Sequence, residues 1–275
     1  MRRHLLNLST RKILGGNGDT LIVGFVVAGE RPREMLIRAV GGSLAKFGVT
    51  GVMSDPKFTL YRSDQSTVVE VNDYIPSVRL SEATSRAGAF ELTGNKDSAT
   101  VITLDPGAYT VHATAANGVG GDALIEVYDV TGRLTGGATE DFVGKAVNLS
   151  TRKVVPSYDT LIVGFVINSD SPRQVLVRAV GPTLGNFGVS GTMADPSFTL
   201  YRPDGSVVAA LDDYAPDTFI NRAVSLSGAF PVSDRREAMQ VINLVPGLYT
   251  VHVKAAPGTA GGDVLVEVYD LTGKL

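Results

Sequence analysis

The chain has 275 residues, of which 44% are hydrophobic and 19% are charged, and its formal net charge is −3 at pH 7. This composition is typical of a folded protein and provides no basic field for a phosphate backbone, so we expect no nucleic acid partner. The lack of cysteine excludes disulfides, thiolate metal sites and cysteine nucleophiles.

Short strands separated by turns are predicted along the whole chain. Apolar residues alternate with a period of two in Thr20–Val27, which is typical of a β-strand. Further strands are predicted at Met35–Val40, Lys57–Arg62, Thr67–Val71, Ala99–Leu104, Ala108–Ala113, Ala123–Asp129, Val147–Arg152 and Val175–Val180. Only Pro76–Ala87 and Asp217–Ser227 could each hold a short helix.

The sequence contains two copies of one domain. Thr20–His112 matches Thr160–His252 with a numbering difference of 140, and Tyr128 matches Tyr269 with a difference of 141. The matching segments include NLSTR, TLIVGF, [IV]RAVG, FTLYR, PGxYTVH and EVYD. Because the numbering difference stays almost constant along the chain, it indicates a duplication. The positions that are identical in both copies are those that resist change.

The fold class that follows is all-β, with two tandem β-sandwich domains of jelly-roll-like architecture. Many short strands with glycine and proline turns favour packed pairs of sheets over helical folds. We expect the first sandwich at residues 1–134, a linker at residues 135–145 and the second sandwich at residues 146–275.

These residues resemble a repeat domain common in secreted proteins of Verrucomicrobia, Planctomycetes and Acidobacteria. The family pattern runs NLSTR, LIxGFxIxG, VLIRAVGPxLxxFGVxGxLxDPxLxLY, PGxYTxxV and ALVEVYDL. The second copy follows it at Leu161–Phe165, Val175–Leu184, Phe187–Pro196 and Asp263–Leu271, whereas the first departs at Gly42 and Ser54. The chain is also similar, less closely, to the bacterial pre-peptidase C-terminal sandwich.

The resemblance implies an extracellular or cell-surface appendage without catalytic activity. It transfers no catalytic residue to this chain. Met1-Arg2-Arg3 is like the start of a signal peptide, but no apolar segment follows it. The residues alone leave open a cytoplasmic chain or a mature region whose leader is missing. The longest apolar stretch, about Leu21–Ala28, is far shorter than the ~20 residues of a membrane helix, so we expect no membrane span.

Repeated polar residues are the candidates for chemistry. His112 and His252 occupy equivalent strand positions, but no nucleophile–base spacing recurs with them, so we expect no enzyme. Repeated aspartates could hold Ca²⁺, which prefers six to eight oxygen ligands, although aspartate also simply forms turns. Asn72, Asp73, Asp212 and Asp213 are the preferred calcium candidates, and no other cofactor is expected.

A repeated arginine lies in the middle of a predicted strand in each copy. Arg38 and Arg178 share a face with apolar neighbours, and a guanidinium buried there needs a partner because an unpaired buried charge is costly. We expect structural ion pairs of Arg38 with Asp55 and of Arg178 with Asp195.

Four tyrosines repeat as well, and they could stack on sugar rings or simply pack in the sheets. They are Tyr61/Tyr201, Tyr74/Tyr214, Tyr109/Tyr249 and Tyr128/Tyr269. A glycan is therefore a candidate partner.

The two ends of the chain match its internal junction, since Leu275 aligns with Leu134. A neighbouring molecule could continue the repeat head to tail, and a heterologous contact that does not close produces a fibre. The residues expected to mediate this self-association are Leu6, Asn7, Leu8, Leu271 and Leu275.

Two functions are therefore expected from the sequence. The first is a non-catalytic structural or adhesive module that contacts itself or other cell-surface proteins and assembles into a filament or surface layer. The alternative is a glycan- or calcium-binding accessory module of a secreted enzyme.

Overall fold

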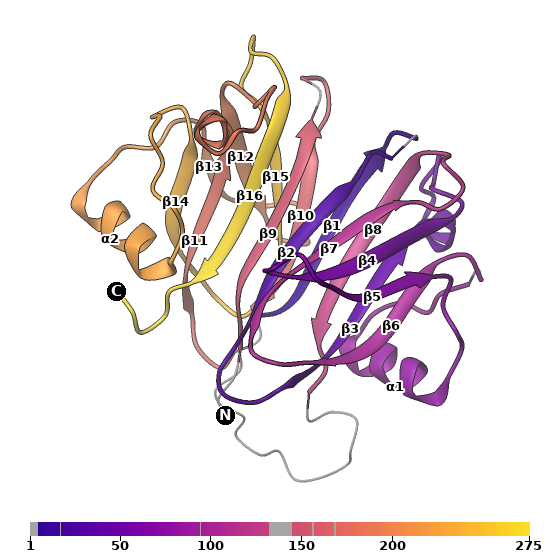
Figure 1. Cartoon of the computed structure of the whole chain (residues 1–275). Helices are drawn as coiled ribbons and strands as arrows, with labels where there is room; N and C mark the ends of the chain where they lie inside the picture. Colours follow the sequence, from indigo (N-terminus) through magenta and orange to yellow (C-terminus); the bar gives the residue numbers. More distant parts are fainter. Residues whose placement is uncertain (1–4, 17, 94, 132–144, 156, 168) are drawn as a thin grey trace. The chain divides into compact units, whose positions relative to one another are not determined.

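The computed structural model describes residues 5–16, 18–93, 95–131, 145–155, 157–167 and 169–275. The chain forms two compact units, one made of Leu6–Ala146 and the other mainly of Val147–Leu275 (Figure 1). The linker predicted at residues 135–145 lies outside the described residues, apart from Lys145, which begins β9. The predicted domain boundaries therefore stay a prediction.

The first unit is a sandwich of two antiparallel sheets. In its described part, one sheet has the order β1-β8-β3-β6 and the other has the order β2-β7-β4-β5. Successive strands lie in different sheets except for the hairpin of β4 and β5, which is the jelly-roll arrangement and confirms the predicted fold class. The strands are β1 (Leu5–Leu14), β2 (Leu21–Ala28), β3 (Arg33–Val40), β4 (Pro56–Arg62), β5 (Thr67–Asn72), β6 (Ser98–Leu104), β7 (Gly107–Ala115) and β8 (Gly121–Asp129).

The second unit repeats this topology. Its sheets have the orders β9-β16-β11-β14 and β10-β15-β12-β13 in the part of the chain that is described. The strands are β9 (Lys145–Val155), β10 (Leu161–Ile167), β11 (Arg173–Val180), β12 (Pro196–Tyr201), β13 (Val207–Leu211), β14 (Ala238–Leu244), β15 (Gly247–Ala255) and β16 (Gly262–Asp270).

The core of each sandwich lies between its two sheets, and the period of two places residues there. In β2, Leu21, Val23 and Phe25 are buried, whereas Ile22 and Val26 on the opposite face are partly exposed. The Phe25 ring stacks on Tyr109 with a centroid distance of 5.6 Å. Phe165 and Tyr249 repeat this contact at the same distance in the second unit.

One short helix covers the outer face of the β3-containing sheet. Helix α1 (Val78–Ala87) begins after Ser77, whose side chain accepts a hydrogen bond from the Leu80 amide, and it ends at Gly88 in the left-handed conformation. Its residues Leu80 and Ala83 pack in a cluster with Leu36 of β3. The helix predicted within Pro76–Ala87 is therefore confirmed.

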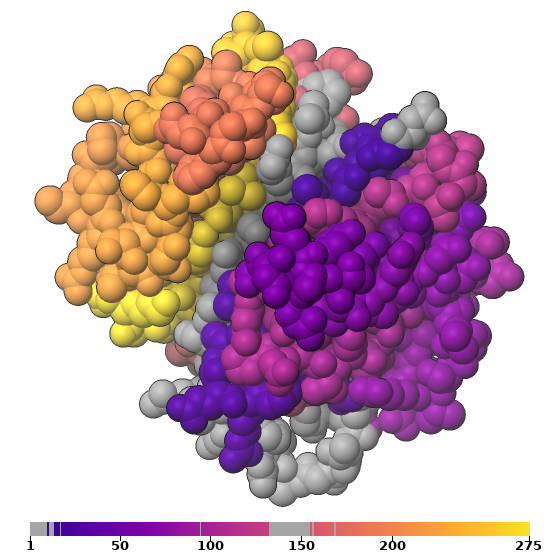
Figure 2. All heavy atoms as spheres, in the orientation of Figure 1, coloured from indigo at the N-terminus to yellow at the C-terminus, as the bar shows by residue number. Residues whose placement is uncertain are grey.

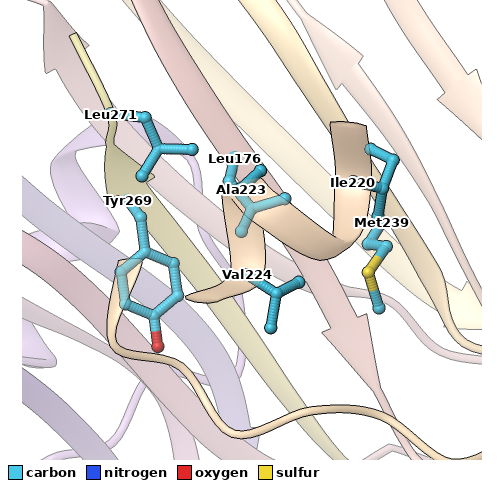
Figure 3. Close-up of a cluster of buried hydrophobic side chains, with 7 residues drawn as sticks. All are labelled: Leu176, Ile220, Ala223, Val224, Met239, Tyr269 and Leu271. Atoms are coloured by element: carbon cyan, nitrogen blue, oxygen red, sulfur yellow. The ribbon is translucent and has the colours of Figure 1, made fainter. Parts of the chain in front are cut away.

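Helix α2 (Thr218–Ser227) covers the equivalent sheet of the second unit. Asp217 caps its start through the Ile220 amide, and Gly228 ends it. Figure 3 shows the buried cluster that α2 forms with the strands below it, made of Leu176, Ile220, Ala223, Val224, Met239, Tyr269 and Leu271. In the space-filling view, the α2 segment (orange) lies at the surface of this unit (Figure 2). The sheet is thereby covered on both faces.

Candidate functional site

Arg38 lies in the middle of β3 and is fully buried. Its Nε and Nη2 donate hydrogen bonds to Oε2 of Glu126 on β8, at 2.9 and 2.5 Å. Its Nη1 donates to the carbonyl of Phe90 at 2.6 Å, and its guanidinium lies 4.5 Å from the centre of the Phe90 ring. The expected pairing with Asp55 is wrong: β8 is the neighbour of β3 in the sheet, and it places Glu126 directly opposite Arg38.

The second unit repeats this arrangement. Arg178 is fully buried, forms an ion pair with Glu267 at 2.7 Å and donates to the Phe230 carbonyl at 2.7 Å. The expected pairing with Asp195 is therefore also wrong. In both units a tyrosine hydroxyl donates to the second carboxylate oxygen at 2.5 Å, from Tyr128 in the first unit and Tyr269 in the second. In the first unit these hydrogen bonds satisfy the charged groups, which indicates a structural role. In the second unit the ion pair joins Arg178 and Glu267, but Nε and Nη2 of Arg178 and Oε2 of Glu267 make no hydrogen bond.

The 3-10 helices η1 (Gly42–Phe47) and η2 (Pro182–Phe187) bring a second aromatic ring to each network. Phe47 meets Phe90 edge-on at 4.8 Å, and Phe187 meets Phe230 at 4.7 Å. The outer rings of Phe47 and Phe187 remain 57% and 61% exposed. In each unit one ring, Phe90 or Phe230, therefore packs on the buried arginine, and an exposed ring, Phe47 or Phe187, packs on the first ring.

A buried carboxylate holds the start of each 3-10 helix, and sequence reasoning missed it. Asp97 accepts hydrogen bonds from the amides of Gly41 and Ser43, at 2.7 and 3.2 Å, and from the Ser43 hydroxyl. Glu237 takes the same place in the second unit, where burial raises its pKa. The sequence did contain a signal for it: the equivalent positions 97 and 237 are both acidic, although the side chain is Asp in one copy and the longer Glu in the other.

The calcium candidates do not converge on a common centre. Asp73 accepts a hydrogen bond from Lys96 at 3.2 Å, and Asn72 is exposed. In the second unit, burial and then the negative charges of Asp212 and Asp213 raise the pKa of Asp195. Within the described residues, no group of three or more His, Cys, Asp or Glu side chains could hold a metal ion.

The predicted self-association residues have different outcomes. Leu271 is fully buried in the α2 cluster of its own unit, and Leu275 is partly buried against the same cluster. The prediction for Leu271 is therefore wrong, because its side chain has no surface left to offer a neighbour. The side chains of Leu6, Asn7 and Leu8 lie outside the described residues.

The tyrosines divide into buried and partly exposed positions. Tyr109, Tyr128, Tyr249 and Tyr269 are buried, so they pack within the fold and cannot stack on a sugar. Tyr61 and Tyr201 are partly exposed on the sheets that α1 and α2 do not cover. Tyr74 and Tyr214 pack against the helix clusters and are also partly exposed.

The repeated histidines lie beside the partly exposed strand tyrosines. The rings of Tyr61 and His112 are 4.8 Å apart with an interplanar angle of 59°, and Tyr201 and His252 have values of 4.7 Å and 56°. Burial lowers the pKa of both histidines. With the adjacent threonines these residues form what we call the ring face: Thr59, Tyr61, Thr110 and His112 in the first unit, and Thr199, Tyr201, Thr250 and His252 in the second.

A groove lies in the first unit between the edge strands β5 and β6 and the start of α1. Its lining includes the apolar residues Val71, Leu80 and Val101 and the charged residues Glu70, Asp73 and Arg79. Ile75 beside it is 85% exposed. The groove contains two of the calcium candidates, Asn72 and Asp73, but the Asp73 carboxylate is bound by Lys96.

No protein-family model matches the chain, and the comparison with curated proteins finds no match. No helix in the described part of the chain has the length and apolar character of a membrane span.

Solved structures similar to this chain have low identities. The pre-peptidase C-terminal domain of a collagenase from Bacillus anthracis is 14% identical with a TM-score of 0.28, and the match covers 44% of this chain and 89% of that domain. The tandem CBM51 modules of a family 98 glycoside hydrolase from Streptococcus pneumoniae are 8% identical with a TM-score of 0.26, covering 94% and 83% of the two chains.

A third similar structure is a cycloisomaltooligosaccharide glucanotransferase from Paenibacillus sp. in complex with cycloisomaltoheptaose. It is 11% identical with a TM-score of 0.25, and the match covers 92% of this chain and 45% of the enzyme. All these TM-scores are below 0.3, so these similarities carry no argument about the function of this chain.

Proposed function

We propose that the chain is a non-catalytic extracellular or cell-surface module of the adhesive type, which attaches to its target through the ring face presented once by each unit. The observation that carries this proposal is the identity of the ring face in the two copies. Thr59, Tyr61, Thr110 and His112 recur unchanged as Thr199, Tyr201, Thr250 and His252.

The residues around the ring face differ between the copies. Lys57 corresponds to Ser197, Glu70 to Ala210 and Thr114 to Lys254. A solvated sheet face tolerates such changes, because side chains there contribute little to the core. The retained centre therefore supports a binding role, since polar and aromatic surface residues that stay constant usually contact a ligand.

The other repeated polar groups support a non-catalytic role. Arg38 and Glu126 bind each other, and Asp97 binds backbone amides of η1. A catalytic base is usually positioned by a carboxylate or another charged partner. The pKa of His112 is instead shifted by burial alone.

Two equal surfaces on one chain suit adhesion to a repetitive target. Each surface alone can bind weakly, because linked binding events raise the overall affinity by about 10²–10⁴-fold.

The extracellular location rests on the resemblance of the repeats to domains of secreted bacterial proteins. Head-to-tail assembly stays a separate prediction, and the adhesive function does not depend on it.

The proposed function is tested by sedimentation of the labelled full-length protein with insoluble matrices. Cellulose, chitin, peptidoglycan and gelatin beads serve as matrices. We expect retention on at least one matrix, weaker retention of the Tyr61→Ala and Tyr201→Ala variants, and loss of retention in the double variant. Retention on none of the matrices, or full retention of the double variant, would contradict the proposal.

A further inference from the structure

The Tyr61 and His112 rings form a corner on the outer face of the β2-β7-β4-β5 sheet. Their interplanar angle of 59° makes them two inclined walls, and the second unit reproduces this angle within three degrees. Both side chains are partly exposed. Because strands hold both rings, the corner is positioned by the sheet itself and not by a loop.

The strand register places small and hydroxyl-bearing residues around the corner. Ile22, His112 and Thr59 lie opposite one another on three neighbouring strands. The next row on the same face contains Gly24, Thr110 and Tyr61. Glycine contributes no side chain to this face, so Thr110 and Tyr61 provide the side chains of the row next to His112.

The same rows recur in the second unit. Ile162, His252 and Thr199 form one row, and Gly164, Thr250 and Tyr201 form the other. All six residues are identical to those of the first unit. The residues at the edges of this face differ between the two units, but those at its centre are identical. Each unit therefore presents the same groups to a ligand.

The centre of the face carries no charged side chain in either unit. In the first unit the nearby charges of Lys57 and Glu70 neutralise each other in an ion pair of 3.1 Å. In the second unit their counterparts Ser197 and Ala210 are uncharged, and the nearby charge is that of Lys254, which lies opposite Ser197 at the edge of the ring face. The four residues that the two ring faces share are all uncharged or neutral, so they provide no counter-charge for a charged ligand, and their chemistry fits an uncharged ligand.

The donors and acceptors of the corner suit a ligand with hydroxyl groups. A threonine or tyrosine hydroxyl donates one hydrogen bond and accepts others, and a neutral imidazole has one donor and one acceptor nitrogen. Burial lowers the pKa of His112 and His252, which keeps both rings neutral at pH 7. The flat faces of the two rings add apolar contact area at low entropic cost.

We propose that Tyr61 with His112, and Tyr201 with His252, form two equivalent subsites for an uncharged carbohydrate ring. Such a ring combines an apolar C–H face, which packs on the tyrosine, with hydroxyl groups, which bond to the imidazole and the threonines. This inference rests on the proposed adhesive function and names the ligand class of the same surface.

The experiment is affinity electrophoresis of the full-length protein in native gels that contain a soluble polysaccharide. The neutral probes are xyloglucan, galactomannan and dextran, and the anionic probe is alginate. We expect retardation by at least one neutral probe and none by alginate. Tyr61→Ala or Tyr201→Ala should weaken the binding about tenfold, and the double variant about a hundredfold, which corresponds to a loss of about 1.4 kcal/mol for each ring contact removed.

Matched controls come from the chain itself. Lys57→Ser and Glu70→Ala give the first unit the residues of the second outside the ring face, and they should leave the retardation unchanged. Thr59→Lys with Thr199→Lys covers both corners without removing either ring, and it should abolish retardation while the thermal unfolding curve stays unchanged. This second pair keeps the test decisive if the alanine variants fold poorly.

Retardation that survives the two threonine substitutions, retardation by alginate only, or retardation by none of the neutral probes would overturn the inference. The sedimentation experiment separates this failure from failure of the adhesive function. Retention on gelatin beads that depends on Tyr61 and Tyr201, without any response to neutral polysaccharides, would keep the adhesive function and replace the carbohydrate by a protein ligand.

Discussion

Arg38 and Glu126 lie directly opposite each other on β3 and β8, and both side chains are buried. The ring of Phe90 packs against the Arg38 guanidinium. Side chains of residues that lie directly opposite each other in an antiparallel strand pair are close enough to interact. Arg178 and Glu267 repeat the relationship on β11 and β16. Each charge is out of water, so each depends on the other for its stability.

Removal of one member of this pair should therefore destabilise the first unit strongly. We expect Arg38→Met to lower the free energy of unfolding by about 3–5 kcal/mol, because it leaves Glu126 buried without its cation. Urea denaturation measures the change, and the double variant Arg38→Met with Glu126→Leu should lose less than the sum of the two single variants. An Arg178→Met variant with full thermal stability would contradict the ion-pair role in the second unit.

Removal of the buried carboxylate below η1 should also destabilise the first unit. Asp97→Ala leaves the amides of Gly41 and Ser43 without their acceptor, and we expect a loss of about 3 kcal/mol in urea denaturation. The control is Asp97→Glu combined with Ser43→Thr, which recreates the Glu237 and Thr183 pair of the second unit. A control as unstable as Asp97→Ala would show that the two sites are not equivalent.

Acidification should weaken the fold through the two histidines. Burial lowers the pKa of His112 and His252 below the ordinary value of 6.5. The unfolded chain therefore binds more protons than the folded chain between that lowered pKa and about pH 6.5, so stability falls as the pH decreases through this window. Thermal unfolding from pH 7.5 to pH 5 measures the slope, and His112→Gln with His252→Gln should reduce it.

Truncation of Leu271 should affect stability and not assembly. Its side chain is buried with Leu176 and Tyr269 beneath α2, and we expect Leu271→Ala to cost about 2–5 kcal/mol in the second unit, as is usual for buried leucines. Denaturation combined with light scattering distinguishes the two roles. A changed oligomeric state without a loss of stability would return Leu271 to the predicted self-association surface.

Much of the fold could be predicted from sequence because it depends on local patterns. The period of two predicted the strand from Thr20, which the structure places at Leu21–Ala28, and the expected helix segments contain α1 and α2. These elements depend on alternation, on caps such as Ser77 and on glycine at the helix ends. The 3-10 helices were not predicted, because their start depends on a carboxylate more than 50 residues away in the chain.

The candidate site was predicted only in part. The copies retained Arg38 and the strand histidines, which identified them as constrained residues. The partner of Arg38 was missed because Glu126 is 88 residues away along the chain, and only the pairing of β3 with β8 brings the two together. His112 was recognised, but its contact with Tyr61 depends on the neighbouring positions of β4 and β7.

The sequence by itself determined that this protein is two copies of one jelly-roll sandwich, since duplication, alternation and turn residues are all local or repeated signals. The tertiary structure decided which of the retained residues hold the fold and which face outward. Strand register pairs Arg38 with Glu126 and not with Asp55, and it brings Tyr61 and His112 together on a sheet face that α1 does not cover. These decisions depend on sheet topology, because residues distant in the chain interact only after the strands have paired.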